Sequence, residues 1–260
     1  MLKFFPQVVL TTLSALSLSS ANAACETKTL RVNELDRSGI VCSSVDSSVP
    51  APLVLVFHGR GSSANEMQAA THLESAWPEA VVVYLEGLSG NPAPHDPQGL
   101  KSGWQINPGD MNNRDVAFVD VALNALTQHY PIDRRKVFAV GHSNGARFVG
   151  VLWALRGKQL AALAFSAAQA DTLIQTAEPR SVFMGMGVHD DLAPFAWQQQ
   201  SIKYAADLLN IRSIDFTYDG VRGAKNRNGL ELLTLIHQGG HIWPIGQTRL
   251  IVEFLKRQNL

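Results

Sequence analysis

The chain has 260 residues, and its 22 lysines and arginines balance 22 aspartates and glutamates, so the formal net charge is zero. With no basic block and no basic amphipathic helix, the sequence gives no reason to expect nucleic acid or an anionic membrane as a partner. Hydrophobic residues make up 46% of the chain, which is ample for one large core, and the length suits one α/β domain better than two.

The start of the chain has the pattern of a leader. Lys3 gives a positive start, an apolar run containing serine and threonine spans 4–18, and Ala21-Asn22-Ala23 resembles a signal-peptidase site. The run is too short for a good membrane-spanning helix, and the alternative is a buried N-terminal helix. We expect a signal peptide over 1–23, one catalytic domain over 24–260, and a secreted or periplasmic monomer without a stable membrane anchor.

Two cysteines, Cys25 and Cys42, lie near the expected mature N-terminus. An even number of cysteines in an exported chain predicts a disulfide, here one that ties the first strand to the body. A loop of this length stabilises the fold by roughly 3 kcal/mol in the chain-entropy model. The alternative is a lipid on Cys25, although the residues before it lack the usual aliphatic side chain. No paired cysteine or histidine spacing indicates a metal site.

After the leader, short apolar runs alternate with helix-like stretches. The runs that predict strands cover 53–57, 80–85, 136–140, 161–165, 181–186 and 230–236. The predicted helices cover 64–76, 113–129, 146–155, 197–209 and 247–257. Alternating β and α units build a mainly parallel sheet with helices on both faces. The sequence therefore predicts a three-layer α/β domain.

Residues that carry chemistry follow four of the predicted strands. The segments after these strands are 58–61, 141–145, 187–194 and 237–244. In sheets of this kind, ligands bind beyond the carboxyl ends of the strands. We therefore expect the four segments to meet at one edge of the sheet.

The segment Gly141-His142-Ser143-Asn144-Gly145 lies between a buried strand and a helix, which is the setting of a nucleophile elbow. The tight turn holds the serine in a strained backbone conformation, and the flanking glycines leave room for neighbouring segments. Such a turn lifts the Ser143 hydroxyl into a cleft. The alternative is a glycine-rich turn without a catalytic role.

A serine hydroxyl needs a base within hydrogen-bond reach, and His241 in a glycine-rich loop after the last strand completes the chain order Ser, Asp, His. Trp243 in the same loop would shield the site from water, and it is a candidate substrate contact. The third member of such a catalytic triad should be a carboxylate that orients the imidazole. Asp190 and Asp191 are adjacent, and spacing alone does not choose between them.

An oxyanion hole needs backbone N–H groups from two places. Asn144, after the nucleophile, supplies one of them. The loop after the first predicted strand supplies the other, for which we favour Arg60 over Gly59. The remaining histidines of these segments, His58 among them, are interpreted as structural.

Several segments together resemble the extracellular poly(3-hydroxybutyrate) depolymerase and feruloyl esterase family of α/β-hydrolases, over 53–244. The segments that carry the resemblance are Leu55-Val56-Phe57-His58-Gly59, Asp115-Val116-Ala117-Phe118-Val119, Gly141-His142-Ser143-Asn144-Gly145 and Gly239-Gly240-His241-Ile242-Trp243-Pro244. The last of these is the most specific. The family's Gly-x-x-Asp-x-x-x-Pro-aromatic stretch matches 187–195, and this match selects Asp190 over Asp191.

The resemblance also implies a cleft segment near Trp104, whose ring would stack against an acyl or aromatic group or pack at the rim. Family members often have a second glycine and a methionine after Ser-Asn-Gly, where this chain has Ala146 and Arg147. Arg147 would pair with an acidic substrate group or form a salt bridge on the helix face.

These residues predict acyl transfer through an acyl-serine, followed by hydrolysis, with no metal or organic cofactor. The expected partners are small or oligomeric esters in solution, such as hydroxycinnamoyl esters or hydroxyalkanoate oligomers. The alternatives are a non-catalytic binding protein of the same fold, or a peptidase or acyltransferase that uses the same three residues.

Overall fold

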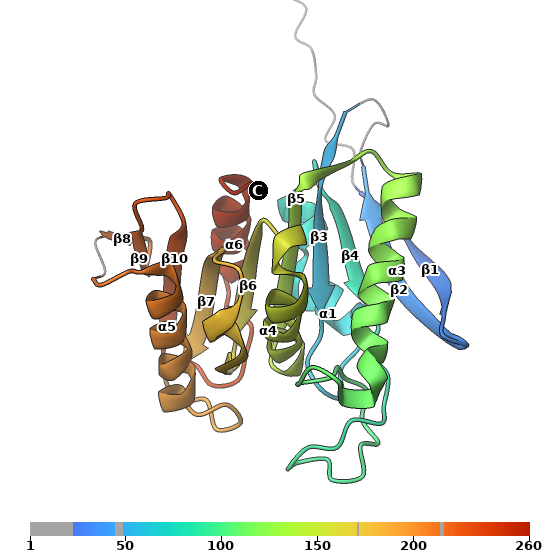
Figure 1. The fold of residues 1–260 in the computed structure, drawn as a ribbon, viewed down its shortest axis with the longest axis horizontal. Coiled ribbons are helices and arrows are strands. Elements are labelled where there is room, and N and C mark those ends of the chain that lie inside the picture. The colour runs from blue at the N-terminus through green and yellow to red at the C-terminus, as the bar shows by residue number, and fades with distance from the viewer. Residues whose placement is uncertain (1–22, 45–48, 171, 214–215) are drawn as a thin grey trace, which may run out of the picture.

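The computed structural model describes residues 23–44, 49–170, 172–213 and 216–260. The described residues contain a ten-stranded sheet in the order β1-β2-β4-β3-β5-β6-β7-β10-β9-β8, with helices packed against it (Figure 1). Neighbouring strands from β4 to β10 in this order are parallel, whereas β1, β2, β9 and β8 are antiparallel to their neighbours. The parallel part is where the predicted chemistry lies.

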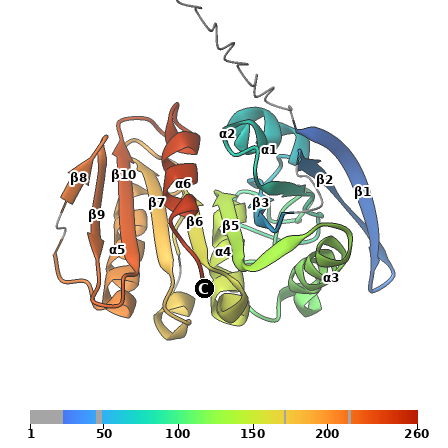
Figure 2. The same cartoon turned by 90° about the horizontal axis from the view of Figure 1, so that it is seen from above.

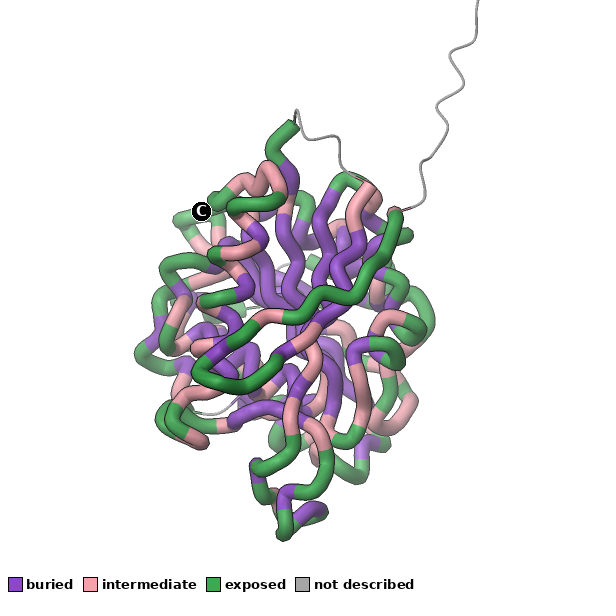
Figure 3. The backbone as a smooth tube through the Cα atoms, turned by 90° about the vertical axis from the view of Figure 1, so that its right-hand side faces the viewer, coloured by how far each residue is buried: buried purple, intermediate pink, exposed green. Residues whose placement is uncertain are grey.

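The strands are β1 (Ala24–Val32), β2 (Leu35–Ser43), β3 (Ala51–Phe57), β4 (Val81–Leu85), β5 (Ile132–His142), β6 (Ala162–Ser166), β7 (Ser181–Gly187), β8 (Phe216–Tyr218), β9 (Val221–Lys225) and β10 (Glu231–His237). Every residue of β4, β6 and β7 is buried. Because helices cover both faces of these strands, both sets of alternating side chains must be apolar or small. Figure 3 shows the result, with buried backbone gathered in the middle of the molecule.

The helices are α1 (Ala64–Thr71), α2 (Leu73–Ala76), α3 (Arg114–His129), α4 (Asn144–Arg156), α5 (Phe195–Leu209) and α6 (Gln247–Lys256), with short 3-10 turns at Asp110–Asn113, Gly157–Gln159 and Thr172–Thr176. Apolar side chains of α3, α4 and α5 pack on one face of the sheet, and those of α1, α2 and α6 pack on the other. Figure 2 shows the two helix layers on either side of the strands. The predicted three-layer α/β fold is confirmed.

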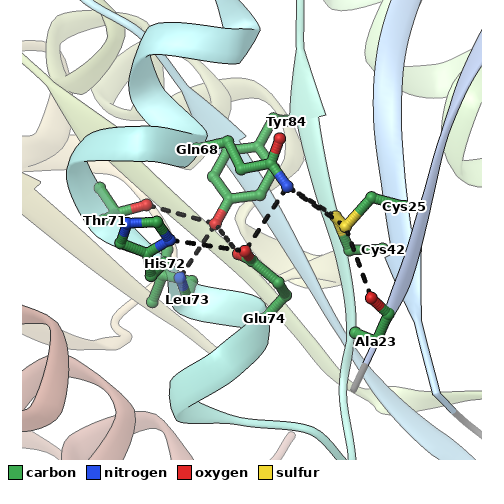
Figure 4. Close-up of a disulfide and its surroundings, with 9 residues drawn as sticks. All are labelled: Ala23, Cys25, Cys42, Gln68, Thr71, His72, Leu73, Glu74 and Tyr84. Carbon is green, nitrogen blue, oxygen red and sulfur yellow. Dashed lines mark hydrogen bonds and ion pairs between the residues drawn. A yellow bond between two sulfur atoms is a disulfide. The ribbon is translucent and has the colours of Figure 1, made fainter.

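A long hairpin forms one edge of the sheet. Its strands β1 and β2 place Cys25 directly opposite Cys42, and the two residues form a disulfide. The side-chain amide of Gln68, on α1, donates to the sulfur atoms of both cysteines at 3.2 and 3.3 Å (Figure 4). The predicted pairing is therefore present, and the bond joins the edge strand to its neighbour β2.

The structure differs from the predicted elements in a few places. The helix expected over 64–76 is divided at His72, whose φ of 45° interrupts the helical backbone. No strand range was predicted for β1, β2, β8 or β9. The expected leader lies outside the described residues except for Ala23. No helix in the described part of the chain is long and apolar enough to cross a membrane.

Candidate active site

The segments after β3, β5, β7 and β10 meet at one edge of the sheet, as predicted. These strands run parallel within one sheet, so their carboxyl ends point the same way. Backbone hydrogen bonds join the segments directly: the N–H of His189 donates to the carbonyl of Gly239 at 3.1 Å. The sheet therefore acts as a rigid frame for side chains that lie far apart in the sequence.

Ser143 lies at a sharp turn between β5 and α4. Its backbone has φ 54° and ψ −123°, a conformation that costs energy for a residue with a Cβ, and its N–H donates to the carbonyl of Ser166 at 2.9 Å. A side chain on Gly145 would collide with the carbonyl of Phe57, and one on Gly141 would lie 2.5 Å from the N of Ala146. Glycine at both positions lets the strand, the turn and the next helix approach closely.

The imidazole of His241 bridges Ser143 and Asp190. Its Nε2 lies 2.7 Å from the Ser143 Oγ, and its Nδ1 lies 2.9 Å from a carboxylate oxygen of Asp190. Because the carboxylate accepts, Nδ1 carries the proton, and Nε2 of the neutral ring is left to accept from the serine hydroxyl. The arrangement has the geometry of a serine, base and acid chain.

Asp190 is held by more than the imidazole. Its Oδ1 accepts from the N–H groups of Leu192 and Ala193 at 3.0 and 2.7 Å, and its Oδ2 accepts from the side-chain amide of Gln198 at 3.1 Å. Asp190 is buried, whereas Asp191 is exposed. The structure thus brings Asp190 to His241. Gln198 was not predicted from the sequence, because it is a buried polar residue of α5 with no local motif.

His142 precedes Ser143 and packs beside His241, with 5.1 Å between the ring centroids. Burial, together with the charge that His241 can carry, lowers the pKa of His142 from 6.5 to about 4. His142 is therefore uncharged at neutral pH, and it does not repel the imidazolium form of its neighbour.

The loop after β3 runs beside Ser143. A side chain on Gly59 would lie 3.3 Å from the Cβ of Ser143. The Gly59 carbonyl accepts from the ring Nδ1 of buried His58 at 2.7 Å and from the N–H of Ser62 at 3.2 Å. The peptide between Gly59 and Arg60 is trans, so the N–H of Arg60 points away from these two donors. His58, interpreted as structural, fixes the plane of this peptide.

The predicted substrate contacts have different surroundings. Trp104 is fully buried, and its ring stacks on Phe148 with centroids 5.3 Å apart, so the predicted contact of its ring with substrate is wrong. Its indole N–H donates to the carbonyl of His58 at 3.0 Å, which makes it a support for the loop after β3. Trp243 and Arg147 are partly exposed near Ser143, and their substrate roles stay predictions.

Sequence comparison finds a relative that resembles part of the chain. No protein-family model matches the chain. The chain is 29% identical over 150 residues to "Putative esterase NocK" of Nocardia uniformis subsp. tsuyamanensis, a match that covers 55% of this chain and 40% of that protein. The chain thus spans less than half the length of this curated relative.

Solved structures of esterases match almost the whole chain. An acetyl xylan esterase from Aspergillus awamori superposes with a TM-score of 0.67 at 13% identity, covering 89% of this chain and 99% of its own. A ferulic acid esterase superposes with a TM-score of 0.66 at 14% identity, covering 91% and 98%. At these identities the likeness concerns the fold, and the fold of this chain is the α/β-hydrolase fold.

Proposed function

We propose that the chain is a serine hydrolase of carboxylic esters, with Ser143 as nucleophile, His241 as base and Asp190 as the acid that orients the base. The observation that carries the proposal is the continuous hydrogen-bonded chain from the Ser143 Oγ through His241 to Asp190, on a strained turn at the carboxyl edge of the sheet. Sequence similarity to an esterase and the folds of two further esterases agree with this class.

The reaction has two halves. The Ser143 Oγ attacks the carbonyl carbon of the ester while its proton passes to Nε2 of His241. The tetrahedral intermediate then expels the alcohol, which takes the proton from His241, and leaves an acyl-serine. In the second half a water gives its proton to His241 and attacks the acyl group, and the carboxylic acid leaves as Ser143 regains its hydrogen.

The negative charge of the tetrahedral intermediate would be stabilised by the N–H groups of Asn144 and Arg60. As the first residue of α4, Asn144 has an N–H that makes no hydrogen bond within the helix. The N–H of Arg60 belongs to the peptide whose carbonyl is held by His58. Donors of this kind contribute about 3 kcal/mol each to binding of the transition state.

The segments that follow the proposed acid and base carry exposed apolar side chains, which supports an apolar or aromatic substrate. Leu192 and Trp197 follow Asp190 in the chain, Ile242 and Ile245 follow His241, and all four side chains are exposed. We infer that soluble esters with an apolar part are the substrates, such as hydroxycinnamoyl esters or hydroxyalkanoate oligomers. A comparison of methyl ferulate, p-nitrophenyl esters of graded length and hydroxybutyrate oligomers distinguishes these classes.

We also propose that residues 1–23 are a signal peptide and that the domain over 24–260 acts in the periplasm or outside the cell. The disulfide between Cys25 and Cys42 supports this proposal, because such bonds persist in oxidising compartments. Cleavage after Ala23 would leave Ala24, the first residue of β1, at the start of the mature chain.

Replacement of the nucleophile tests the proposed function. Ser143→Ala should lower the turnover of p-nitrophenyl acetate by at least about 10⁴-fold, because no other group can form the acyl intermediate. The melting temperature should change little, because the substitution removes only the hydroxyl and leaves the turn in place. Ser44→Ala removes a hydroxyl that bonds to the carbonyl of Pro78 and serves as the control with normal turnover. Turnover by Ser143→Ala comparable to that of the wild type would refute the assignment.

A further inference from the structure

A largely buried network joins the side chains of Arg60 and Asn144, the two residues whose N–H groups form the proposed oxyanion hole. It passes through the loop between β4 and α3. The guanidinium of Arg60 donates from Nη1 to the carbonyl of Asn91 at 2.5 Å and to the Asp96 carboxylate at 3.2 Å. One end of the network therefore begins on the segment after β3.

The other end of the network begins on the elbow. The Asn144 side chain pairs with the backbone of Trp104: its Oδ1 accepts from the Trp104 N–H at 2.7 Å, and its Nδ2 donates to the Trp104 carbonyl at 3.1 Å. The same carbonyl accepts from Nδ2 of Asn91 at 2.6 Å. Asn91 thus accepts from Arg60 with its backbone carbonyl and donates to Trp104 with its side chain. It therefore connects the segment after β3 to the elbow.

The network is largely shielded from water, and its Arg60 side chain is 13% exposed. Asn91, Asp96 and Asn144 are each at most 7% exposed, and Trp104 is fully buried. Shielded hydrogen bonds fix geometry well, because water does not compete for their donors and acceptors. Asp96 further secures the loop by accepting from the N–H groups of Leu100 and Lys101 at 3.0 and 3.2 Å.

A hole built from two segments works only if their N–H groups keep the right separation, since oxyanion donors must lie within a few tenths of an ångström of their place. We propose that Asn91 is a positioning residue that holds the N–H groups of Arg60 and Asn144 at the separation that an oxyanion requires. The proposal rests on the proposed function above. Asn91 does not touch the reacting atoms and acts through the residues it joins.

Two variants of Asn91 test the proposal. Asn91→Ala removes the amide and keeps the backbone carbonyl that Arg60 uses. Asn91→Asp keeps the shape but sets a carboxylate against the Trp104 carbonyl, where the amide donor stood. Both should lower kcat for p-nitrophenyl acetate by about 10- to 100-fold and change KM by less than about twofold, because substrate binding precedes formation of the oxyanion.

A second readout separates positioning from folding. Phenylboronic acid forms a tetrahedral adduct when the Ser143 Oγ bonds to boron and its proton passes to Nε2 of His241, and one boron oxygen takes the place of the oxyanion. Its affinity should fall in both variants by a factor close to the loss in kcat. If Asn91→Ala melts below the assay temperature, the Asn91→Asp measurement decides.

Asn226→Ala is the matched control. Asn226 also donates from Nδ2 to a backbone carbonyl, that of Leu209 at 2.8 Å, in the turn between β9 and β10. It should lower the melting temperature and leave kcat and boronate affinity unchanged. Wild-type kcat and boronate affinity in a folded Asn91 variant would overturn this inference. Ester turnover by Ser143→Ala, or its absence from the wild type, would instead overturn the proposed function.

Discussion

Asp190 was selected over Asp191 by the family resemblance alone, and in the structure it is Asp190 that lies 2.9 Å from Nδ1 of His241. Asp190→Asn should reduce kcat by about 10²- to 10⁴-fold, because an amide that donates to Nδ1 forces the imidazole into the tautomer that cannot accept the serine proton. Steady-state turnover of p-nitrophenyl acetate measures the loss.

Asp191→Asn provides the comparison within the same turn. Asp191 is exposed and follows the residue that contacts His241, so its replacement should leave kcat within about twofold of the wild type. A larger loss from Asp191→Asn than from Asp190→Asn would transfer the acid to the neighbouring position.

His142 makes a prediction about pH. The pKa of His142 is about 4 in the folded chain, below its value of 6.5 in the unfolded chain. As pH falls from 6.5 to 4 the unfolded state takes up a proton first, so the free energy of unfolding decreases across this range and no further below it. With a discount for the partial exposure of the side chain, the loss is on the order of 2 kcal/mol.

His142→Gln removes the titrating ring, so the decrease in the free energy of unfolding that His142 causes at low pH should disappear. Urea unfolding at pH 7 and pH 4 measures it for both proteins. The wild type should lose more stability than the variant between these two pH values. Equal losses in the two proteins would show that His142 titrates normally in the folded chain.

Among single residues, those that belong to a motif after a strand could be predicted from the sequence, and those without a motif could not. Ser143 and His241 each lie in a distinctive segment after a strand, so the sequence placed both at one edge of the sheet. Gln198 and Asn91 have no such signal, because their partners are Asp190 and Trp104, whose distance from them is set by the fold. The predicted substrate contact of Trp104 was wrong because the sequence does not indicate whether a tryptophan near a cleft points its ring into the cleft or into the core.

Among the elements, the predicted strands that were buried on both faces agree with the structure to within a few residues, since a short continuous apolar run bounded by turn residues is typical of a buried strand. The exception is β5, which extends to Ile132 through a charged stretch at its start. The hairpin of β1 and β2 was not recognised as a pair, because the first six residues of β1 are exposed and carry no apolar pattern.

The disulfide makes a prediction about this hairpin. Replacement of Cys25 and Cys42 by serine together should lower the free energy of unfolding by about 3 kcal/mol, because the unfolded chain gains the entropy of an open loop. The loss should leave kcat unchanged, since β1 is the edge strand and lies several strands away from β5, β7 and β10.

Reduced wild-type protein should match the double-serine variant in urea unfolding, which checks that the bond and not the side chains causes the loss. If the oxidised, reduced and substituted proteins have the same stability, the disulfide does not restrain the unfolded chain as proposed. A parallel fall in kcat would mean that the hairpin supports the site.

For the whole molecule, the sheet converts four distant segments into one site. β3 brings the loop with Arg60, β5 brings Ser143, β7 brings Asp190 and β10 brings His241. This arrangement follows from alternating β and α units and could be predicted from sequence. The network through Asn91 could not, because it lies in a loop whose path depends on the assembled core.

The most direct test of the central claim is covalent labelling of Ser143, the proposed nucleophile. Diethyl p-nitrophenyl phosphate should react once per chain: the Ser143 Oγ bonds to phosphorus, p-nitrophenolate leaves, and ester hydrolysis is lost in proportion to the label. Peptide mass spectrometry should find the diethylphosphoryl group on Ser143 and on no residue of Ser143→Ala. A stoichiometric label on another residue, or full ester hydrolysis by the chain labelled at Ser143, would contradict the account.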